Sequence, residues 1–81
     1  MTAAIDALLA EASARRSLPP VELRRLLRQR VGISQQELAD VLGVSRPALS
    51  RWETGSRSPR GSSRIAYAQA LQRLGQEEVA A

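Results

Sequence analysis

GISQQELADVLGVSRPALSRWETG, residues 32–55, contains two short segments with the apolar spacing of helices, and Gly43 separates them. Ser34 and Glu37 form the pattern of a capping box, in which each side chain accepts a hydrogen bond from a free backbone amide at the start of a helix. Glycine readily adopts the left-handed backbone conformation with which many helices end. The stretch therefore predicts two helices joined by a tight turn.

Small and apolar residues in the same stretch indicate how the two helices pack. Ala39 allows the second helix to approach the first closely, and Leu49 and Trp52 lie on the side of the second helix that would be anchored. Ser45 is a suitable N-cap for this helix, and Pro47 in its first turn costs no hydrogen bond. The polar side of the second helix is then left free for a ligand.

The stretch resembles the helix-turn-helix of the phage lambda repressor and Cro family, also called xenobiotic-response-element-like regulators. The resemblance covers residues 20–60, places the motif at residues 34–53, and rests on GISQxELA, LGVS and SRWExG. In this family the second motif helix enters the major groove of DNA and the first lies across the backbone. The resemblance implies an all-α fold, namely a compact five-helix orthogonal bundle. Residues 1–81 are expected to form one DNA-binding domain.

The resemblance also implies which side chains contact double-stranded DNA. Arginine can bond both O6 and N7 of guanine, and a proline ring can touch a thymine methyl group. The implied base-reading residues, all in the second motif helix, are Arg46, Pro47, Ser50 and Arg51. The implied phosphate-binding residues, at the start of the first helix and around the second, are Gln35, Ser45, Thr54, Ser56, Arg57 and Arg60. Arg28 and Glu53 match the positions of a structural ion pair.

Two helices are predicted before the motif. The first, within residues 1–16, is an addition to the family pattern, and we expect its apolar stripe to face the core, with a dimer contact or a surface for another protein as alternatives. The stripe consists of Ile5, Leu8, Leu9 and Ala12. The Pro19-Pro20 pair separates this helix from the second, which ends near Gly32. In the second helix, the residues expected to face inward are Leu23, Leu26, Leu27 and Val31. Those expected to face outward are Arg24, Arg25 and Arg30.

After the motif, a polar loop leads to a last helix over about residues 63–74. Gly75 is expected to end this helix, and the tail from 76 to 81 is expected to fray. Trp52 is expected to be a core anchor because it lies on the inner side of its helix. Tyr67 is predicted to be half-buried, without an assigned role.

The composition excludes several classes of function. The 81 residues include no cysteine and no histidine, which removes disulfides, thiolate metal sites and imidazole bases. The eight carboxylates form no evident catalytic pair, so no enzyme, metal or cofactor is expected. The formal charge is +4, and all twelve cationic residues are arginines, whose planar donors suit phosphates and guanine edges. No apolar run reaches the length of a membrane span and no secretion signal is evident, so a cytoplasmic protein is expected.

These observations lead to one main hypothesis and two alternatives. The chain is expected to be a sequence-specific transcriptional regulator, a repressor that binds a palindromic operator as a homodimer. The first alternative is a DNA-binding antitoxin or accessory regulator whose N-terminal helix binds a protein partner. The second is a helix-turn-helix used only for protein contacts, which would have no salt-dependent affinity for DNA.

Overall fold

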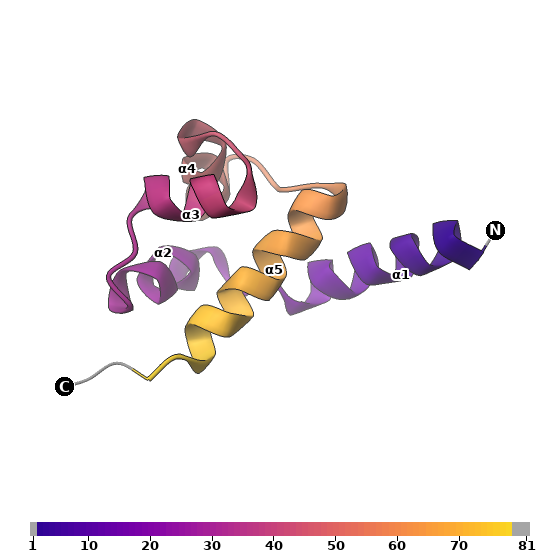
Figure 1. Ribbon diagram of the computed structural model, residues 1–81, viewed down its shortest axis with the longest axis horizontal. Coiled ribbons are helices and arrows are strands. Elements are labelled where there is room, and N and C mark those ends of the chain that lie inside the picture. The colour runs from indigo at the N-terminus through magenta and orange to yellow at the C-terminus, as the bar shows by residue number, and fades with distance from the viewer. Residues whose placement is uncertain (1, 79–81) are drawn as a thin grey trace.

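Five helices form the part of the chain that the computed structural model describes, residues 2–78 (Figure 1). They are α1 (Thr2–Ser17), α2 (Val21–Arg30), α3 (Gln35–Leu42), α4 (Arg46–Thr54) and α5 (Gly61–Gln76). These residues contain no strand, which confirms the predicted all-α, five-helix bundle. α1 packs on α5 and extends away from the other helices. Within residues 2–78, no helix has both the length and the apolar composition that crossing a bilayer requires.

The two motif helices begin where the sequence predicts. Ser34 Oγ accepts a hydrogen bond from the Glu37 amide at 3.0 Å, and the Glu37 carboxylate accepts one from the Ser34 amide at 2.9 Å. The hydrogen bond from the Ser34 amide to the carboxylate is the main cause that lowers the pKa of Glu37 below its ordinary value. Ser45 Oγ accepts from the Ala48 amide at 3.2 Å and caps α4. Between the helices, Gly43 has a φ of +70°, in the left-handed region that strains residues with a Cβ atom.

Tyr67 of α5 lies at the centre of the core. It is fully buried, and its ring centroid lies 5.1 Å from that of Trp52. Trp52 is also buried, as predicted, whereas the expectation of a half-buried Tyr67 is wrong. Tyr67 is buried in a cluster with residues of α3 and α4, and these neighbours have no local sequence signal. The buried cluster consists of Leu38, Ala39, Leu49, Trp52, Tyr67, Leu71 and Leu74.

The Tyr67 hydroxyl is buried without a hydrogen-bond partner among the described residues, and this burial raises the pKa of Tyr67 to about 12. An unpartnered buried polar group destabilises a fold by about 1–3 kcal/mol, so Tyr67→Phe is expected to raise the free energy of unfolding by about 1 kcal/mol. Urea unfolding followed by circular dichroism measures this change. As a control, Tyr67→Leu should lower stability because it leaves a cavity. A clear loss of stability in Tyr67→Phe would instead mean that a buried water bonds the hydroxyl.

α1 turns its small residues toward the protein, and its large apolar residues are mainly exposed, with Leu8 also bordering a hollow at the start of α5. Ala14 is buried, and the Glu11 carboxylate accepts hydrogen bonds from Arg64 at 3.0 Å and from the Gly61 amide at 3.2 Å. The expectation that the α1 stripe faces the core is therefore wrong. Small side chains let α1 approach α5 closely, and the Glu11 contacts hold it in that rotation. The large stripe residues are more than half exposed: Ile5 (55%), Leu8 (59%) and Leu9 (61%).

α2 is also rotated relative to its expected orientation. Leu23 and Leu26, expected to face inward, are 47% and 55% exposed. Arg24, expected to face outward, is half-buried and donates a hydrogen bond to the Trp52 carbonyl at 3.0 Å. Arg28 is buried next to it. Both expectations are wrong because Arg24 and Arg28 donate hydrogen bonds to acceptors on α4. Aliphatic side chains could not bond these acceptors. Leu27 and Val31 do pack against the core, and Arg25 and Arg30 are exposed.

α5 is longer than predicted at both ends. It begins at Gly61 and continues through Gly75 to Gln76, so the expectation that Gly75 ends the helix is wrong. Arg30 of α2 donates to the carbonyl oxygens of Gly75 and Glu77 at 3.3 and 2.7 Å. These bonds pair two carbonyl groups at the end of α5, where the helix itself supplies no partner. In the predicted frayed tail, Gln76 is helical, residues 77 and 78 follow the helix, and residues 79–81 lie outside the described residues.

Candidate nucleic-acid interface

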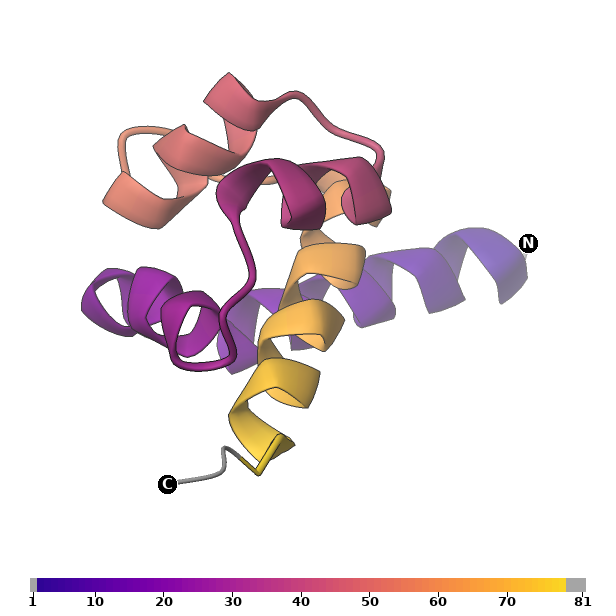
Figure 2. The same cartoon turned by 60° about the vertical axis from the view of Figure 1, so that its left-hand side comes forward.

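α3 and α4 form a closely packed pair of helices, with α4 at the outer surface of the protein (Figure 2). Ala39 is fully buried, and its carbonyl accepts a hydrogen bond from the Val44 amide at 3.0 Å, which closes the turn between the helices. Leu49 of α4 is also fully buried. One side of α4 is thus anchored in the core, and its other side is open to a ligand.

Three of the four predicted base-reading residues are exposed on α4. Arg46, Pro47 and Arg51 are exposed, and Ser50 is half-buried. The single acidic residue of α4, Glu53, is buried and paired with an arginine of α2. The open side of α4 therefore keeps the positive charge of both its arginines, and it has the sign of charge that attracts a nucleic acid.

The residues that follow α4 are attached to its last turn. Thr54 Oγ1 and Ser56 Oγ each donate a hydrogen bond to the Arg51 carbonyl, at 3.2 and 3.5 Å. The Arg57 amide donates to the same carbonyl at 3.3 Å. Ser45, at the other end of α4, uses its hydroxyl as the helix cap. These exposed hydroxyl groups, which the resemblance assigns to phosphates, thus also hold the two ends of the helix.

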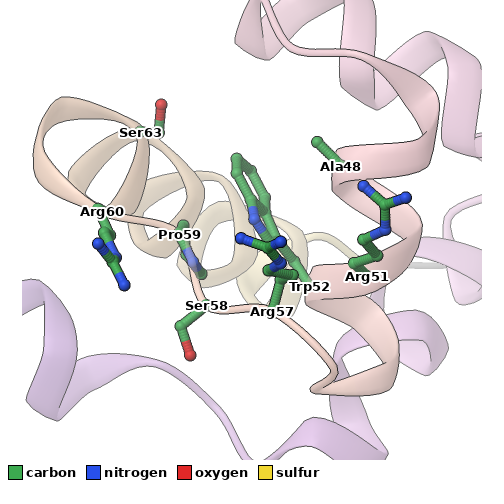
Figure 3. A pocket seen from close by; sticks show the side chains of 8 residues that line it. All are labelled: Ala48, Arg51, Trp52, Arg57, Ser58, Pro59, Arg60 and Ser63. Atoms are coloured by element: carbon green, nitrogen blue, oxygen red, sulfur yellow. The ribbon is translucent and has the colours of Figure 1, made fainter.

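Arg51, Arg57 and Arg60 line a hollow of about 470 Å³ between α4 and the start of α5 (Figure 3). Trp52 and Pro59 form its apolar wall. Guanidinium groups bind phosphate oxygens in bidentate fashion, so three of them around one hollow suit a phosphate of a nucleic acid backbone. The sequence assigned Arg51 to bases and the other two to phosphates, and it did not predict that they share one hollow.

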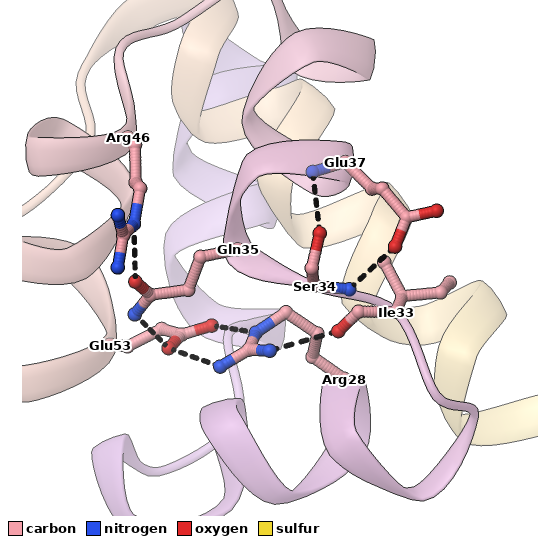
Figure 4. Close-up of polar contacts among 7 residues, drawn as sticks. All are labelled: Arg28, Ile33, Ser34, Gln35, Glu37, Arg46 and Glu53. Carbon is pink, nitrogen blue, oxygen red and sulfur yellow. Dashed lines mark hydrogen bonds and ion pairs between the residues drawn. The ribbon is translucent and has the colours of Figure 1, made fainter.

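Arg28 of α2 and Glu53 of α4 form a buried ion pair on the inner side of α4 (Figure 4). Arg28 Nε and Nη2 donate to the two carboxylate oxygens of Glu53 at 2.6 and 3.0 Å, and Nη1 donates to the Ile33 carbonyl at 2.8 Å. Burial acts to raise the pKa of Glu53, but hydrogen bonds from Arg28 and Gln35 outweigh burial and lower it. The carboxylate is therefore ionised at neutral pH, and the pair connects α2 with α4 and with the residues that precede α3.

Gln35 connects this ion pair to the exposed side of α4 (Figure 4). Its Nε2 donates to Glu53 Oε1 at 2.9 Å, and its Oε1 accepts a hydrogen bond from Arg46 Nε at 3.3 Å. One N–H of the amide remains for a phosphate, because the amide nitrogen has two hydrogens. Sequence reasoning missed the contact with Arg46. No local pattern signals this contact, because the two residues lie 11 positions apart on different helices.

The comparison with known families covers the segment that forms this surface. A family model described as helix-turn-helix matches residues 25–75. This segment contains α3, α4 and the hollow lined by Arg51, Arg57 and Arg60, here called the arginine hollow. The chain belongs to the helix-turn-helix family. No curated protein and no solved structure matches the chain.

Membership of the helix-turn-helix family confirms the resemblance to the lambda repressor and Cro regulators. The chain thus carries the domain of a DNA-binding transcription regulator, and α4 is the second helix of its motif. The match begins at residue 25, so α1 lies before the segment that the helix-turn-helix family shares. Within residues 2–78 no three acidic side chains are placed to hold a metal ion.

Proposed function

We propose that this helix-turn-helix protein is a sequence-specific transcriptional repressor that binds a palindromic operator as a dimer. The main support is that Arg46 and Arg51 are exposed on a helix whose opposite side is anchored by Leu49 and Trp52. Mobile arginines bind the phosphates of any DNA, whereas arginines on a fixed helix can be held in register with particular bases. The anchored helix therefore favours sequence-specific binding.

In the proposed complex, α4 lies in the major groove with its first turn toward the bases. The hydrogen bond from Arg46 Nε to Gln35 restrains this arginine and leaves its two terminal nitrogens for O6 and N7 of a guanine. Arg51, one and a half turns further along, reads a second base pair. Pro47 contacts a thymine methyl group, and Ser50 bonds a base edge.

The phosphates on either side of the groove are proposed to be bound by residues at the ends of the two motif helices. At the start of α3, Gln35 contributes one side-chain N–H and the helix contributes its free backbone amides. Ser45 lies at the start of α4. At the other end, Thr54 and Ser56 donate their hydroxyl hydrogens to the Arg51 carbonyl, and each would rotate its hydroxyl to donate to a phosphate instead. Arg57 and Arg60 bind a phosphate in the arginine hollow.

The proposed dimer places two α4 helices in successive major grooves of one DNA face. Half-sites would be about 34 Å apart, which is one turn of DNA, and the operator would be palindromic because the dimer has a two-fold axis. Repression is the simplest outcome, because it requires only that the bound protein occupies DNA that the transcription machinery needs.

Selection from random duplexes, followed by sequencing, tests this function. We expect a palindromic consensus, with half-sites spaced by about one helical turn. Titration of the selected duplex at several salt concentrations should show an affinity that falls steeply as salt increases. The proposal is wrong if no sequence is enriched and the protein has no affinity for duplexes at low salt.

Gln35→Ala distinguishes two roles for this side chain. If Gln35 restrains Arg46, the variant should bind the selected duplex about tenfold more weakly and should lose preference at the base that Arg46 reads. Fluorescence anisotropy with the consensus and with single-base variants measures both effects. An equal loss on all sequences would show that Gln35 acts only through a phosphate. Gln36→Ala, next to it on the exposed side of α3, is the matched control.

A second function has support from α1. A DNA-binding antitoxin or accessory regulator would use this helix to bind a protein partner, and the exposed α1 stripe offers an apolar surface for one. Co-purification of a defined second protein in equal amounts, which is lost when the stripe is substituted, would favour this function over the homodimeric repressor.

A further inference from the structure

The α1 stripe is an exposed apolar surface on a helix outside the segment that matches the family. Ile5, Leu8 and Leu9 lie along one side of α1, and their side chains are each more than half exposed. Ala12 continues the stripe and is half-buried. Contiguous exposed aliphatic side chains of this kind mark contact surfaces for other proteins.

The orientation of the stripe is held by contacts on the opposite side of α1. Ala10 and Ala14 lie toward α5, and Glu11 bonds to both Arg64 and the Gly61 amide. A rotation of α1 that buried the stripe against α5 would break the Glu11 bonds and would replace alanines by leucines in a close helix contact. The stripe is thus presented to the surroundings by the fold itself.

We propose that the α1 stripe docks against the α1 stripe of a second copy, with the two helices antiparallel. This inference rests on the proposed dimeric function and assigns its interface. An antiparallel pair centred between Leu8 and Leu9 places Leu8 against Leu9 of the second copy and Ile5 against Ala12. The largest residues therefore face each other at the centre, and a large residue faces a small one at each end. The arrangement is symmetric, as a two-fold dimer requires.

The charges of α1 favour the same orientation. Asp6 gives the first half of the helix a net charge of −1, and Glu11, Arg15 and Arg16 together give the second half a net charge of +1. Antiparallel pairing brings the acidic half of one copy beside the basic half of the other, and it also opposes the two helix dipoles. Parallel pairing would place arginine beside arginine. Because only a few side chains contribute to the interface, the dimer without DNA is expected to be weak. Its population should therefore depend on protein concentration.

Sedimentation of the full chain without DNA tests the surface. The wild-type protein should sediment as a dimer at high concentration, and Leu9→Glu should raise the dissociation constant at least about tenfold, because symmetry buries two carboxylates. Val41→Glu is the matched control, since Val41 is 82% exposed on α3. Leu23→Glu tests whether the exposed residues of α2 form the dimer interface instead. A wild-type monomer at the highest soluble concentration, or dimer loss in the Val41 or Leu23 variant alone, overturns the proposal.

Disulfide cross-linking tests the orientation, because the chain has no cysteine of its own. In the antiparallel pair, residue 5 of one copy lies about 10 Å along the helix axis from residue 5 of the other, too far for a disulfide. Ile5→Cys alone should therefore not cross-link, whereas a mixture of Ile5→Cys and Ala12→Cys should form the mixed dimer. Cross-linking of Ile5→Cys with itself would indicate a parallel pair and would overturn the proposed arrangement.

DNA binding separates this inference from the proposed function. Leu9→Glu should keep its affinity for a single half-site, because α4 is unchanged, and should lose at least about tenfold in affinity for the full operator. If the wild-type protein dimerises through α1 but binds no duplex, the proposed function fails and the interface stands. If it binds half-sites but Leu9→Glu binds the full operator equally well, the interface fails and DNA binding stands.

Discussion

Arg28→Met is expected to lower the free energy of unfolding by about 3–5 kcal/mol, because it leaves the Glu53 carboxylate buried without its cationic partner. The Glu53 side chain is only 2% exposed, so water cannot replace the two hydrogen bonds that Arg28 donates. The Ile33 carbonyl also loses its donor. Urea unfolding measures the loss, which is a large part of the stability of a domain of this size.

A double variant and a pH series test this cause. Arg28→Met combined with Glu53→Met should recover most of the loss, because an apolar pair needs no partner charges. In the wild-type protein the folded-state pKa of Glu53 is lowered, so its contribution to stability is present at neutral pH and decreases as pH falls below its ordinary value of 4.5. In Arg28→Met, burial raises that pKa, so lowering the pH from 7 toward 4.5 should reduce the stability difference. A pH-independent difference would contradict this cause.

Arg46→Ala is expected to weaken binding to the selected operator by about 1–3 kcal/mol, roughly a 5- to 150-fold loss, with little change in binding to random DNA. Arg46 is exposed in the first turn of α4, which the proposed complex places toward the bases, and its side chain is restrained by Gln35. Fluorescence anisotropy with the operator, with operators altered at one base pair, and with random duplex measures the affinity and the preference.

Arg73→Ala is the matched control for Arg46→Ala. It removes the same charge from an exposed position near the end of α5, away from α4 (Figure 1). The control should change affinity little and should leave the base preference unchanged, because its effect is limited to long-range attraction. An equal loss on operator and random DNA in Arg46→Ala would instead place Arg46 on a phosphate.

The predicted parts of the fold are those with short-range causes. The start of α3 depends on bonds between Ser34 and Glu37, three residues apart, and the start of α4 depends on Ser45 and the amide three residues later. Such bonds form within a single helical turn, so the sequence pattern contains all their partners. The resemblance of residues 32–55 to a known motif supplied the other predictions, including the exposed position of Arg46.

Apart from the burial of Tyr67, the incorrect predictions concern the rotation or length of a helix. Apolar spacing predicted that Leu23 and Leu26 face inward, but that pattern gave no weight to Arg24 and Arg28, whose acceptors lie on α4. For α1, the pattern favoured the large stripe residues, but the alanine side allows closer packing on α5. α5 extends beyond Gly75 because Arg30, 45 residues earlier in the chain, bonds the terminal carbonyls.

From the sequence alone, one can establish the five helices, the helix-turn-helix, the positive charge and the absence of residues for common catalytic and metal sites, because each follows from composition or from neighbours within a turn. The burial of Tyr67, the three arginines around one hollow, the contact from Gln35 to Arg46 and the exposure of the α1 stripe became visible only in the folded chain. Each depends on groups that lie beyond a single helical turn, and their distances and hydrogen bonds exist only after the helices pack.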